Sequence, residues 1–316
     1  MPEIVVALIA GGISSERAVS LAGGDQIFAA LDKKKYTILR YDPREDIARL
    51  VQDAGRIDTA FVNLHGRWGE DGSVQGLLDL LNIPYQCSGV LGSALATNKL
   101  ASKQIYAQAG LPVAPYTIVR RGEKTGPDEW LQRLPGGPVE KVVVKPVSGG
   151  SSIGMSIVSE RSELKPAVEL AWVHDEAALI EPYIQGVELT GGVIGNDTPE
   201  PLPVVEIIPG DQYVFFNYEA KYTPGATREI CPARISESLA AKVQTYACRA
   251  HKALFCKGYS RTDMIARGDE VFVLETNTIP GMVPTSLLPL AARTAGLSFS
   301  DLLDRLITLS LEKTGD

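Results

Sequence analysis

Two polar side chains near the end of one predicted strand are placed where they could bind a metal ion. Glu275 and Asn277 follow the apolar run 271–274, which predicts a strand, and their spacing of two residues directs both to the same face. Asp263 lies in a second predicted strand about a hairpin away. Their oxygen atoms suit a hard cation such as Mg²⁺. The combined spacing favours a metal–phosphate site over a capped strand end with solvated polar residues.

A loop rich in glycine and serine could bind phosphate. It covers 146–154, includes Ser151 and Ser152, and follows Lys145 at the end of a predicted strand. Small residues let backbone N–H groups converge on an anion, and the lysine adds a point charge. The loop lacks the ending of a Walker A motif, so by itself it could be a mobile hairpin turn. Lys99, at the start of a predicted helix, is a second phosphate candidate or a solvated lysine.

The segment 181–188 has the character of a hinge between two domains. Pro182 restricts Glu181 to an extended conformation, which exposes backbone groups that could recognise a base edge. Glu188 could accept hydrogen bonds from ribose hydroxyls. A plain interdomain linker is compatible with the same sequence.

Three further segments could face a substrate. Glu16 and His65 each follow a predicted strand at the edge where open α/β sheets bind ligands. Glu16 could neutralise an ammonium group or cap the next helix, and the acidic residues after His65 could also be helix caps. Lys221 and Tyr222 lie in a weakly structured stretch, about 209–228, whose length favours a lid.

Composition describes an ordinary globular protein. The 316 residues are 45% hydrophobic and 22% charged, enough for two or three domains. The net charge of −7 argues against nucleic acid as a partner. The four cysteines lack metal-ligand spacing and predict free thiols in a reducing compartment. We expect no signal peptide and no membrane span, because a strand begins almost at once and no apolar run is long enough.

The predicted elements alternate between strands and helices and indicate an α/β chain. Strands and helices alternating before residue 97 predict a parallel sheet with helices on both faces. The stretch 111–138 is rich in Gly, Pro and charge and predicts loops and edge structure. The expected strands are 3–10, 36–41, 58–64, 142–145, 154–158, 178–183, 187–194, 202–207, 259–266 and 271–274. The expected helices are 19–31, 74–81, 98–109, 164–174, 236–255, 287–295 and 302–311, with an amphipathic stretch at 47–51.

Taken in order, these segments resemble the D-alanine–D-alanine ligases of bacterial cell-wall synthesis, in the ATP-grasp superfamily. The resemblance covers residues 4 to about 296. It is carried by Gly-Gly-x-Ser-x-Glu, His-Gly-x-x-Gly-Glu-Asp-Gly, Ile-Pro-Tyr, Lys-Pro-x-x-x-Gly-Ser-Ser-x-Gly, Glu-Ala-Lys-Tyr, Arg-x-Asp and Glu-x-Asn-Thr-x-Pro-Gly-Met. It implies three domains: an N-terminal Rossmann-like substrate domain (1–97), a central ATP-grasp subdomain (98–184) and a C-terminal catalytic domain (185–316).

The resemblance also implies roles for individual residues. Two Mg²⁺ or Mn²⁺ ions would be held by Asp263, Glu275 and Asn277. ATP would be bound by Lys99, Lys145, Ser152, Glu181, Ile184, Glu188 and Lys221. The first D-alanine would meet Glu16, networked with Ser151 and Tyr222, and His65. Arg261 and the Gly281 N–H would stabilise the developing oxyanion, and Ser286 and Leu287 would bind the second D-alanine's carboxylate.

The family's reaction would be ATP-dependent formation of an acyl phosphate, which the second amine attacks to give D-alanyl-D-alanine for peptidoglycan. The resemblance implies a cytoplasmic homodimer. Gln86-Cys87 departs from the family's common Thr-Gly after Ile-Pro-Tyr, and no proposed metal or phosphate ligand is missing. Tyr222 favours an amine as acceptor. The alternatives are a ligase that joins D-alanine to D-lactate or D-serine, and a catalytically silent nucleotide-binding protein.

Overall fold

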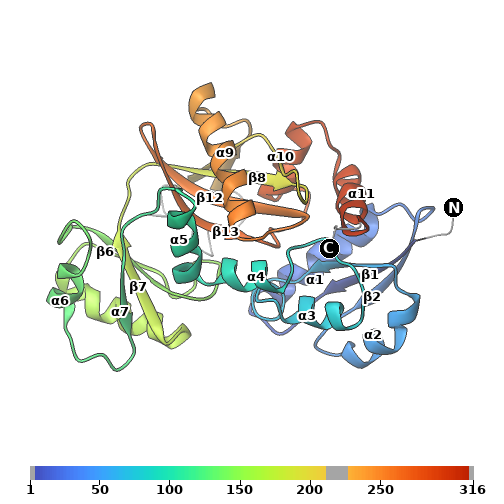
Figure 1. The fold of residues 1–316 in the computed structure, drawn as a ribbon, viewed down its shortest axis with the longest axis horizontal. Helices are drawn as coiled ribbons and strands as arrows, with labels where there is room; N and C mark the ends of the chain where they lie inside the picture. The colour runs from blue at the N-terminus through green and yellow to red at the C-terminus, as the bar shows by residue number, and fades with distance from the viewer. Residues whose placement is uncertain (1–3, 211–226, 313–316) are drawn as a thin grey trace.

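The strands form three separate sheets, and helices pack on each of them (Figure 1). The structure is a computed structural model and describes residues 4–210 and 227–312. Most of the stretch predicted to be a lid, including Lys221 and Tyr222, lies outside the described residues. Thr227 and Arg228, at the end of that stretch, are the first residues of a strand instead.

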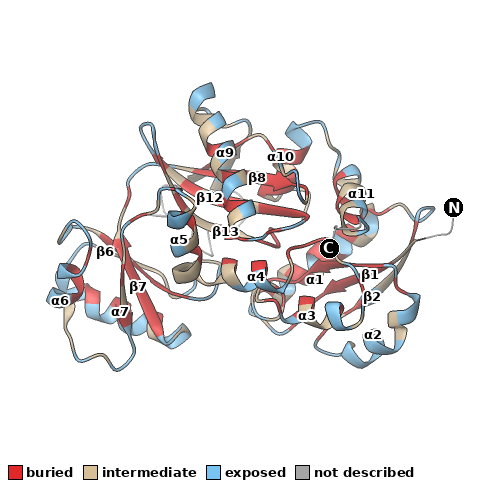
Figure 2. Ribbon diagram, in the orientation of Figure 1, coloured by how far each residue is buried: buried red, intermediate tan, exposed pale blue. Residues whose placement is uncertain are grey.

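The first sheet is parallel, as predicted, with the strand order β2-β1-β3. Five consecutive residues of β1, Val6–Ala10, are buried, and successive side chains of a strand point to opposite faces. Both faces of this sheet are therefore covered along β1, which is largely red in Figure 2, whereas β2 at the edge is mostly intermediate. Its elements are β1 (Ile4–Ala10), α1 (Arg17–Ala30), β2 (Tyr36–Tyr41), α2 (Ile47–Asp53), η1 (Ala54–Arg56), β3 (Thr59–Asn63), α3 (Ser73–Leu80) and α4 (Val90–Thr97).

The residue pair Gln86-Cys87, which departs from the family pattern, completes the edge of this sheet. The Gln86 side chain accepts a hydrogen bond from Val62 N at 2.9 Å and donates one to Val62 O at 2.8 Å. The amide thus takes the place of a neighbouring strand's peptide group, directly after the short parallel bridge between Ala60 and Tyr85. Cys87 is buried in the same core.

The second sheet is antiparallel, with the order β4-β7-β5-β6. β5 and β6 form the predicted hairpin around the glycine- and serine-rich loop. The prediction of loops and edge structure over 111–138 is confirmed by the edge strand β4, but the helix α6 in this stretch was not predicted. That helix begins with a proline and buries Trp130 and Leu131. The elements are α5 (Lys99–Gln108), β4 (Thr117–Arg120), α6 (Pro127–Gln132), β5 (Val142–Pro146), β6 (Ser156–Val158), α7 (Arg161–His174) and β7 (Ala177–Pro182).

The third sheet is also antiparallel and has the order β11-β10-β8-β12-β13, with β9 paired to β8. Helix α9 lies close against it, since a Cβ added at Gly191 would stand 2.7 Å from the Ala247 Cβ. The last helix, α11, instead packs on the first sheet, where Leu302 and Leu306 join its core. The elements are β8 (Val187–Ile194), β9 (Glu200–Pro201), β10 (Val205–Pro209), β11 (Thr227–Ile230), α9 (Glu237–Ala253), β12 (Tyr259–Arg267), β13 (Glu270–Asn277), α10 (Leu287–Thr294) and α11 (Phe299–Ser310).

Candidate active site

Two cavities adjoin where the three sheets meet. The first lies between the β5–β6 loop, the hinge after β7 and the strands β12 and β13. The second has a volume of about 650 Å³, within the range of small-molecule sites, and is bounded by α1, the β5–β6 loop and the segment after β13. Gly149, Gly150 and Glu275 line both cavities, so a ligand in one can approach a ligand in the other at these residues.

The predicted metal ligands come together on two paired strands. Asp263 on β12 lies opposite Glu275 on β13, and Arg261 lies opposite Asn277. Arg261 Nε and a terminal nitrogen donate to the two oxygens of Asp263 at 2.9 and 2.8 Å. Asn277 Nδ2 donates to Asp263 Oδ2 at 3.1 Å. A bulge after Asp263 shifts the register of the pairing and interrupts the ladder beside these groups.

The oxygen atoms of this group fit a hard divalent cation. The described residues contain no cluster of three or more His, Cys, Asp and Glu side chains that could hold a metal. Here two carboxylates, Asp263 and Glu275, are supplemented by the carboxamide of Asn277. Such a set leaves coordination positions for water and phosphate oxygens, as Mg²⁺ prefers.

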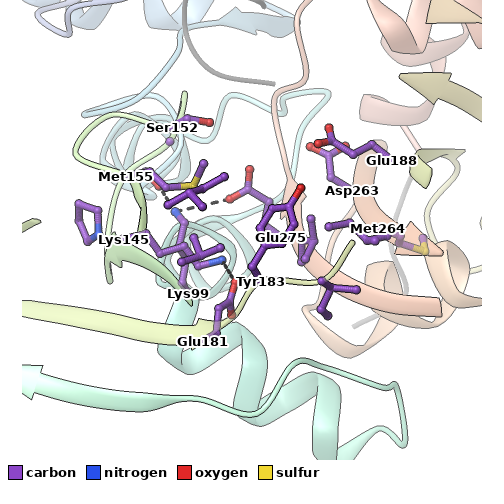
Figure 3. A pocket seen from close by; sticks show the side chains of 18 of the residues that line it. Lys99, Lys145, Ser152, Met155, Glu181, Tyr183, Glu188, Asp263, Met264 and Glu275 are labelled. Atoms are coloured by element: carbon purple, nitrogen blue, oxygen red, sulfur yellow. Dashed lines mark hydrogen bonds and ion pairs between the residues drawn. The ribbon is translucent and has the colours of Figure 1, made fainter. Parts of the chain in front are cut away.

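Strand β5 and helix α5 bring two lysines, Lys145 and Lys99, to the first cavity, next to the β5–β6 loop. Lys99 Nζ donates to the Gly149 carbonyl and lies 3.5 Å from Glu275 Oε2 (Figure 3). Lys99 N also donates to Val147 O at 2.7 Å, which fixes the start of α5 against the loop. Ser151 and Ser152 both have left-handed backbone conformations, with φ of 52° and 57°. Consecutive residues of this kind are typical of loops whose N–H groups bind anions.

The hinge contributes a buried carboxylate to the same cavity. Glu181 Oε1 accepts a hydrogen bond from Lys145 Nζ at 2.5 Å (Figure 3). Burial opposes its ionisation, but Lys103 and Lys145 together hold the pKa of Glu181 at about 2. The rest of the wall is largely apolar and suits a flat ring, with Glu188 at one side. The apolar wall residues are Val143, Ile153, Met155, Ile157, Tyr183, Ile184, Leu189, Ile207, Met264, Ile265 and Leu274.

Glu16 faces the second cavity rather than the helix it precedes. It is the N-terminal flanking residue of α1, yet its side chain makes no capping hydrogen bond. Its carboxylate instead accepts a hydrogen bond from Ser151 Oγ in the β5–β6 loop. The alternative interpretation of Glu16 as a helix cap is therefore wrong, and the contact joins the first and second sheets across the cavity.

Two titratable groups lie beside Glu16. Burial lowers the pKa of His65, against the opposing effects of Glu16 and the Ile279 backbone, so the imidazole is neutral. Burial, with the negative charge of Glu16 nearby, raises the pKa of Glu70 to about 8. Gly66 N donates to Glu70 Oε2 at 2.7 Å. This end of the second cavity therefore carries a neutral histidine beside the carboxyl group of Glu16.

The segment after β13 closes the opposite side of the second cavity. Gly281 and Ser286 are close neighbours, because a Cβ added at Gly281 would stand 3.0 Å from Ser286 Oγ. Ser286 is the N-terminal flanking residue of α10, whose first residue is Leu287. Arg261 also lines this cavity and gives it a positive charge. Helix N-termini and guanidinium groups both favour carboxylates.

All the predicted site residues within the described part of the chain line one of the two cavities. The first is lined by Lys99, Lys145, Ser152, Glu181, Ile184, Glu188, Asp263 and Glu275. The second is lined by Glu16, His65, Ser151, Arg261, Glu275, Asn277, Gly281, Ser286 and Leu287.

Sequence reasoning gave no role at the site to three charged residues: Lys103, Glu70 and Glu229. Glu70 and Glu229 line the second cavity, and Lys103 forms an ion pair with Glu181. The only signal for Lys103 was its position one helical turn after Lys99.

Sequence comparisons identify the chain's relatives. The family model described as D-ala D-ala ligase C-terminus matches residues 105–308, and the model for the N-terminus matches residues 44–88. The D-alanine–D-alanine ligase of Syntrophobacter fumaroxidans is 60% identical over 98% of this chain and 98% of its own length. That of Desulfotalea psychrophila is 52% identical over 98% and 95%.

Solved structures agree with these relatives. The D-alanine–D-alanine ligase of Bacillus anthracis complexed with ATP has a TM-score of 0.83 and 34% identity, covering 98% of this chain and 97% of that one. The VanG D-Ala:D-Ser ligase of Enterococcus faecalis has a TM-score of 0.84 and 30% identity, covering 98% and 99%. The chain therefore has the ATP-grasp fold and belongs to the D-alanine–D-alanine ligase family of ATP-dependent ligases.

Proposed function

We propose that this chain uses ATP to join two D-alanines into D-alanyl-D-alanine, a precursor of peptidoglycan. The main support is that the two cavities adjoin at Glu275, Gly149 and Gly150, which line both of them. A nucleotide in the first cavity, with its phosphates toward this junction, would place the γ-phosphate beside a carboxylate in the second. Positioning and charge neutralisation supply most of the catalysis in such transfers.

In this proposal the first cavity binds ATP. The ammonium groups of Lys99 and Lys145 contact phosphates, with Ser152 from the loop between the strands. Glu181, Ile184 and Glu188 contact the adenosine, and the apolar wall encloses the base. Lys221 approaches the γ-phosphate from the predicted lid. The ion pair between Lys99 and Glu275, 3.5 Å apart, supports placing the phosphates next to the proposed metal ligands.

Asp263, Glu275 and Asn277 would hold two Mg²⁺ or Mn²⁺ ions. When bound, such ions neutralise phosphate charge and align the reacting oxygens. Arg261 holds both oxygens of Asp263 in this structure and also lines the second cavity.

The second cavity would bind both amino acids. Glu16, held by Ser151 and supported by Tyr222, binds the ammonium of the first D-alanine, and His65 lies beside it. Ser286 and Leu287 at the start of α10 bind the carboxylate of the second. Arg261 and the Gly281 N–H face the carbonyl between them. These positions match a cavity with a carboxylate at one end and a helix N-terminus at the other.

The reaction then follows in two steps. The first D-alanine's carboxylate attacks the γ-phosphate, which gives an acyl phosphate and ADP. The second D-alanine's amine attacks that carbonyl, Arg261 and the Gly281 N–H stabilise the tetrahedral oxyanion, and phosphate leaves. Exclusion of water by the lid protects the acyl phosphate from hydrolysis.

The proposal extends to the organisation of the protein. We divide the chain into domains at 1–97, 98–184 and 185–316, and expect two copies to form a dimer in the cytoplasm. All four cysteines are free, as expected of a reducing compartment. Within the described residues, no helix combines the length and apolar character needed to cross a membrane. Light scattering of the purified protein tests the dimer.

Release of ADP in the presence of Mg²⁺ and different amino acids tests the function. We expect rapid turnover with D-alanine alone, no turnover with L-alanine, and a product with the mass of D-alanyl-D-alanine. Turnover that requires D-lactate or D-serine would keep the ATP-dependent chemistry and contradict the assigned acceptor. ATP binding without turnover on any of these would identify a silent member of the family.

A further inference from the structure

Lys103 is a fully buried lysine on the inner face of helix α5. Its side chain has no exposed surface, and the other buried residues of this helix are Ser102 and Tyr106. Lysine is almost never fully buried unless it is paired, because removing an ammonium from water is costly. The Nζ atom lies 2.7 Å from Glu181 Oε2. Burial lowers the pKa of Lys103, and the charge of Glu181 opposes this effect.

Glu181 therefore stands between two lysines. Lys103 is bound at one carboxylate oxygen, and Lys145 is bound at the other at 2.5 Å. The carboxylate is ionised at neutral pH, since its pKa is about 2. Two ammonium groups and one carboxylate leave a net charge of +1 on this buried group. A pair of Glu181 and Lys145 alone would have no net charge.

The three residues differ in their access to the nucleotide cavity. Lys145 and Glu181 line it, as Figure 3 shows, whereas Lys103 lies behind them and is not part of the wall. A nucleotide in this cavity would thus meet the ammonium of Lys145 but not that of Lys103. The buried lysine can act on a ligand only through the charge and the position of Glu181.

We propose that Lys103 is a positioning residue that neutralises Glu181, so that the positive charge of Lys145 is available to the phosphates of ATP. The proposal rests on the assignment of ATP to the first cavity. Without Lys103, the negative charge of Glu181 would be compensated by Lys145 alone, and the attraction of this site for phosphate would fall. Adenosine carries no phosphate, so its binding depends on this group only through its own contact with Glu181 and should change much less than that of ATP.

Calorimetric titration with ATP and with adenosine separates this role from a purely structural one. Lys103→Met should weaken ATP binding by about tenfold more than it weakens adenosine binding, because only ATP meets the charge of Lys145 with its phosphates. Lys103→Arg keeps the charge and should retain the preference for ATP over adenosine. Lys165→Met removes one positive charge from an exposed position of α7 and serves as the matched control.

Lys103→Met removes one partner of a buried ion pair and could prevent folding. A comparison of Glu181→Gln with the double variant Glu181→Gln/Lys103→Met avoids this problem, because the ion pair is absent from both. In a Glu181→Gln background there is no negative charge to neutralise, and a fully buried lysine without a charged partner gives up its proton. Adding Lys103→Met there should change the ratio of ATP to adenosine affinity by less than about twofold. A large additional loss of ATP affinity in this background would overturn the proposal.

Other outcomes separate this inference from the proposed function. Equal weakening of ATP and adenosine by Lys103→Met would show that Lys103 only holds the hinge in place, and unchanged binding of both would show no role. If Lys145→Ala weakened ATP binding while Lys103→Met did not, this inference alone would fail. If Lys145→Ala left ATP binding intact, the assignment of ATP to the first cavity would fail.

Discussion

Ser151 Oγ donates a hydrogen bond to Glu16 Oε1, and this contact joins the loop between β5 and β6 to the start of helix α1. The two residues lie in connecting segments next to different sheets, and both line the second cavity. Glu16 makes no hydrogen bond that caps its own helix, so its carboxylate is held for another purpose. A fixed carboxylate at this position can select an ammonium group.

We expect Ser151→Ala to raise the Michaelis constant for the first D-alanine by about tenfold, since a hydrogen bond to a charged group contributes about 1.5–3 kcal/mol. Both serine and alanine have a Cβ, so the left-handed backbone at this position is strained no further. Initial rates over a range of D-alanine concentrations measure the effect. Ser162→Ala, at an exposed position of α7, is the control, and a Michaelis constant equal to the control's would contradict the assignment.

Glu275→Gln should reduce turnover by about 100-fold or more, because the amide is a weaker metal ligand and bound ions supply several kcal/mol of transition-state stabilisation. Glu275 lines both cavities, and its side chain is one-quarter exposed rather than packed in a core. The melting temperature should therefore change by only a few degrees.

The control for this substitution is Glu270→Gln, at an exposed position of the same strand. Titration with Mg²⁺ at fixed ATP separates weaker metal binding from other causes of lost activity. Turnover by Glu275→Gln at the rate of the control would remove Glu275 from the metal site.

Much of the site could be predicted because its residues lie at the ends of strands with clear patterns. The alternation in 271–274 and the spacing of Glu275 and Asn277 place both groups on one face without reference to the rest of the fold. The pairing of Asp263 with Glu275 then follows from a hairpin between neighbouring strands.

Other features depend on contacts that no local pattern contains. Helix α4 has only eight residues, and its place is set by Gly92, where an added Cβ would lie 2.9 Å from the backbone oxygens of Leu254 and Phe255. In the sequence, Lys103 cannot be told from an ordinary solvated helix lysine, because its ion pair with Glu181 joins residues far apart in the chain. Glu229 reaches the second cavity only because β11 pairs with β10.

Gln86→Ala should lower the free energy of unfolding by about 1–3 kcal/mol, the cost of leaving buried hydrogen-bonding groups unpaired. Its side chain is the partner of both Val62 N and Val62 O, and it is almost completely buried. Urea denaturation measures the change. Gln132→Ala, at an exposed position, should remain within about 0.5 kcal/mol of the parent protein. Equal stability of the two variants would show that water replaces the Gln86 amide at no cost.

His251 should make the protein less stable in mild acid. It is fully buried on α9, where its Nδ1 lies 2.8 Å from Ser260 Oγ. Burial lowers the pKa of His251 to about 4, with a smaller contribution from Lys252 and against the effect of the Gly195 backbone. The unfolded chain therefore binds a proton at a pH where the folded protein does not.

This difference sets the sign and the range of the effect. Stability from the neutral His251 is fully present above pH 6.5, the ordinary pKa of histidine, and is lost as the pH falls toward 4. Between pH 8 and pH 5 the loss should be about 2 kcal/mol, because each pH unit below 6.5 costs about 1.4 kcal/mol. Other groups, among them Glu70 with its raised pKa, also change the stability between these pH values, so the His251 contribution is read as a difference between variants. Urea denaturation at pH 8 and pH 5 should show the same pH dependence in the parent protein and in His174→Gln, an exposed control. In His251→Gln the stability at pH 5, relative to pH 8, should be about 2 kcal/mol higher than in the parent protein, and an unchanged pH dependence would contradict the role of His251.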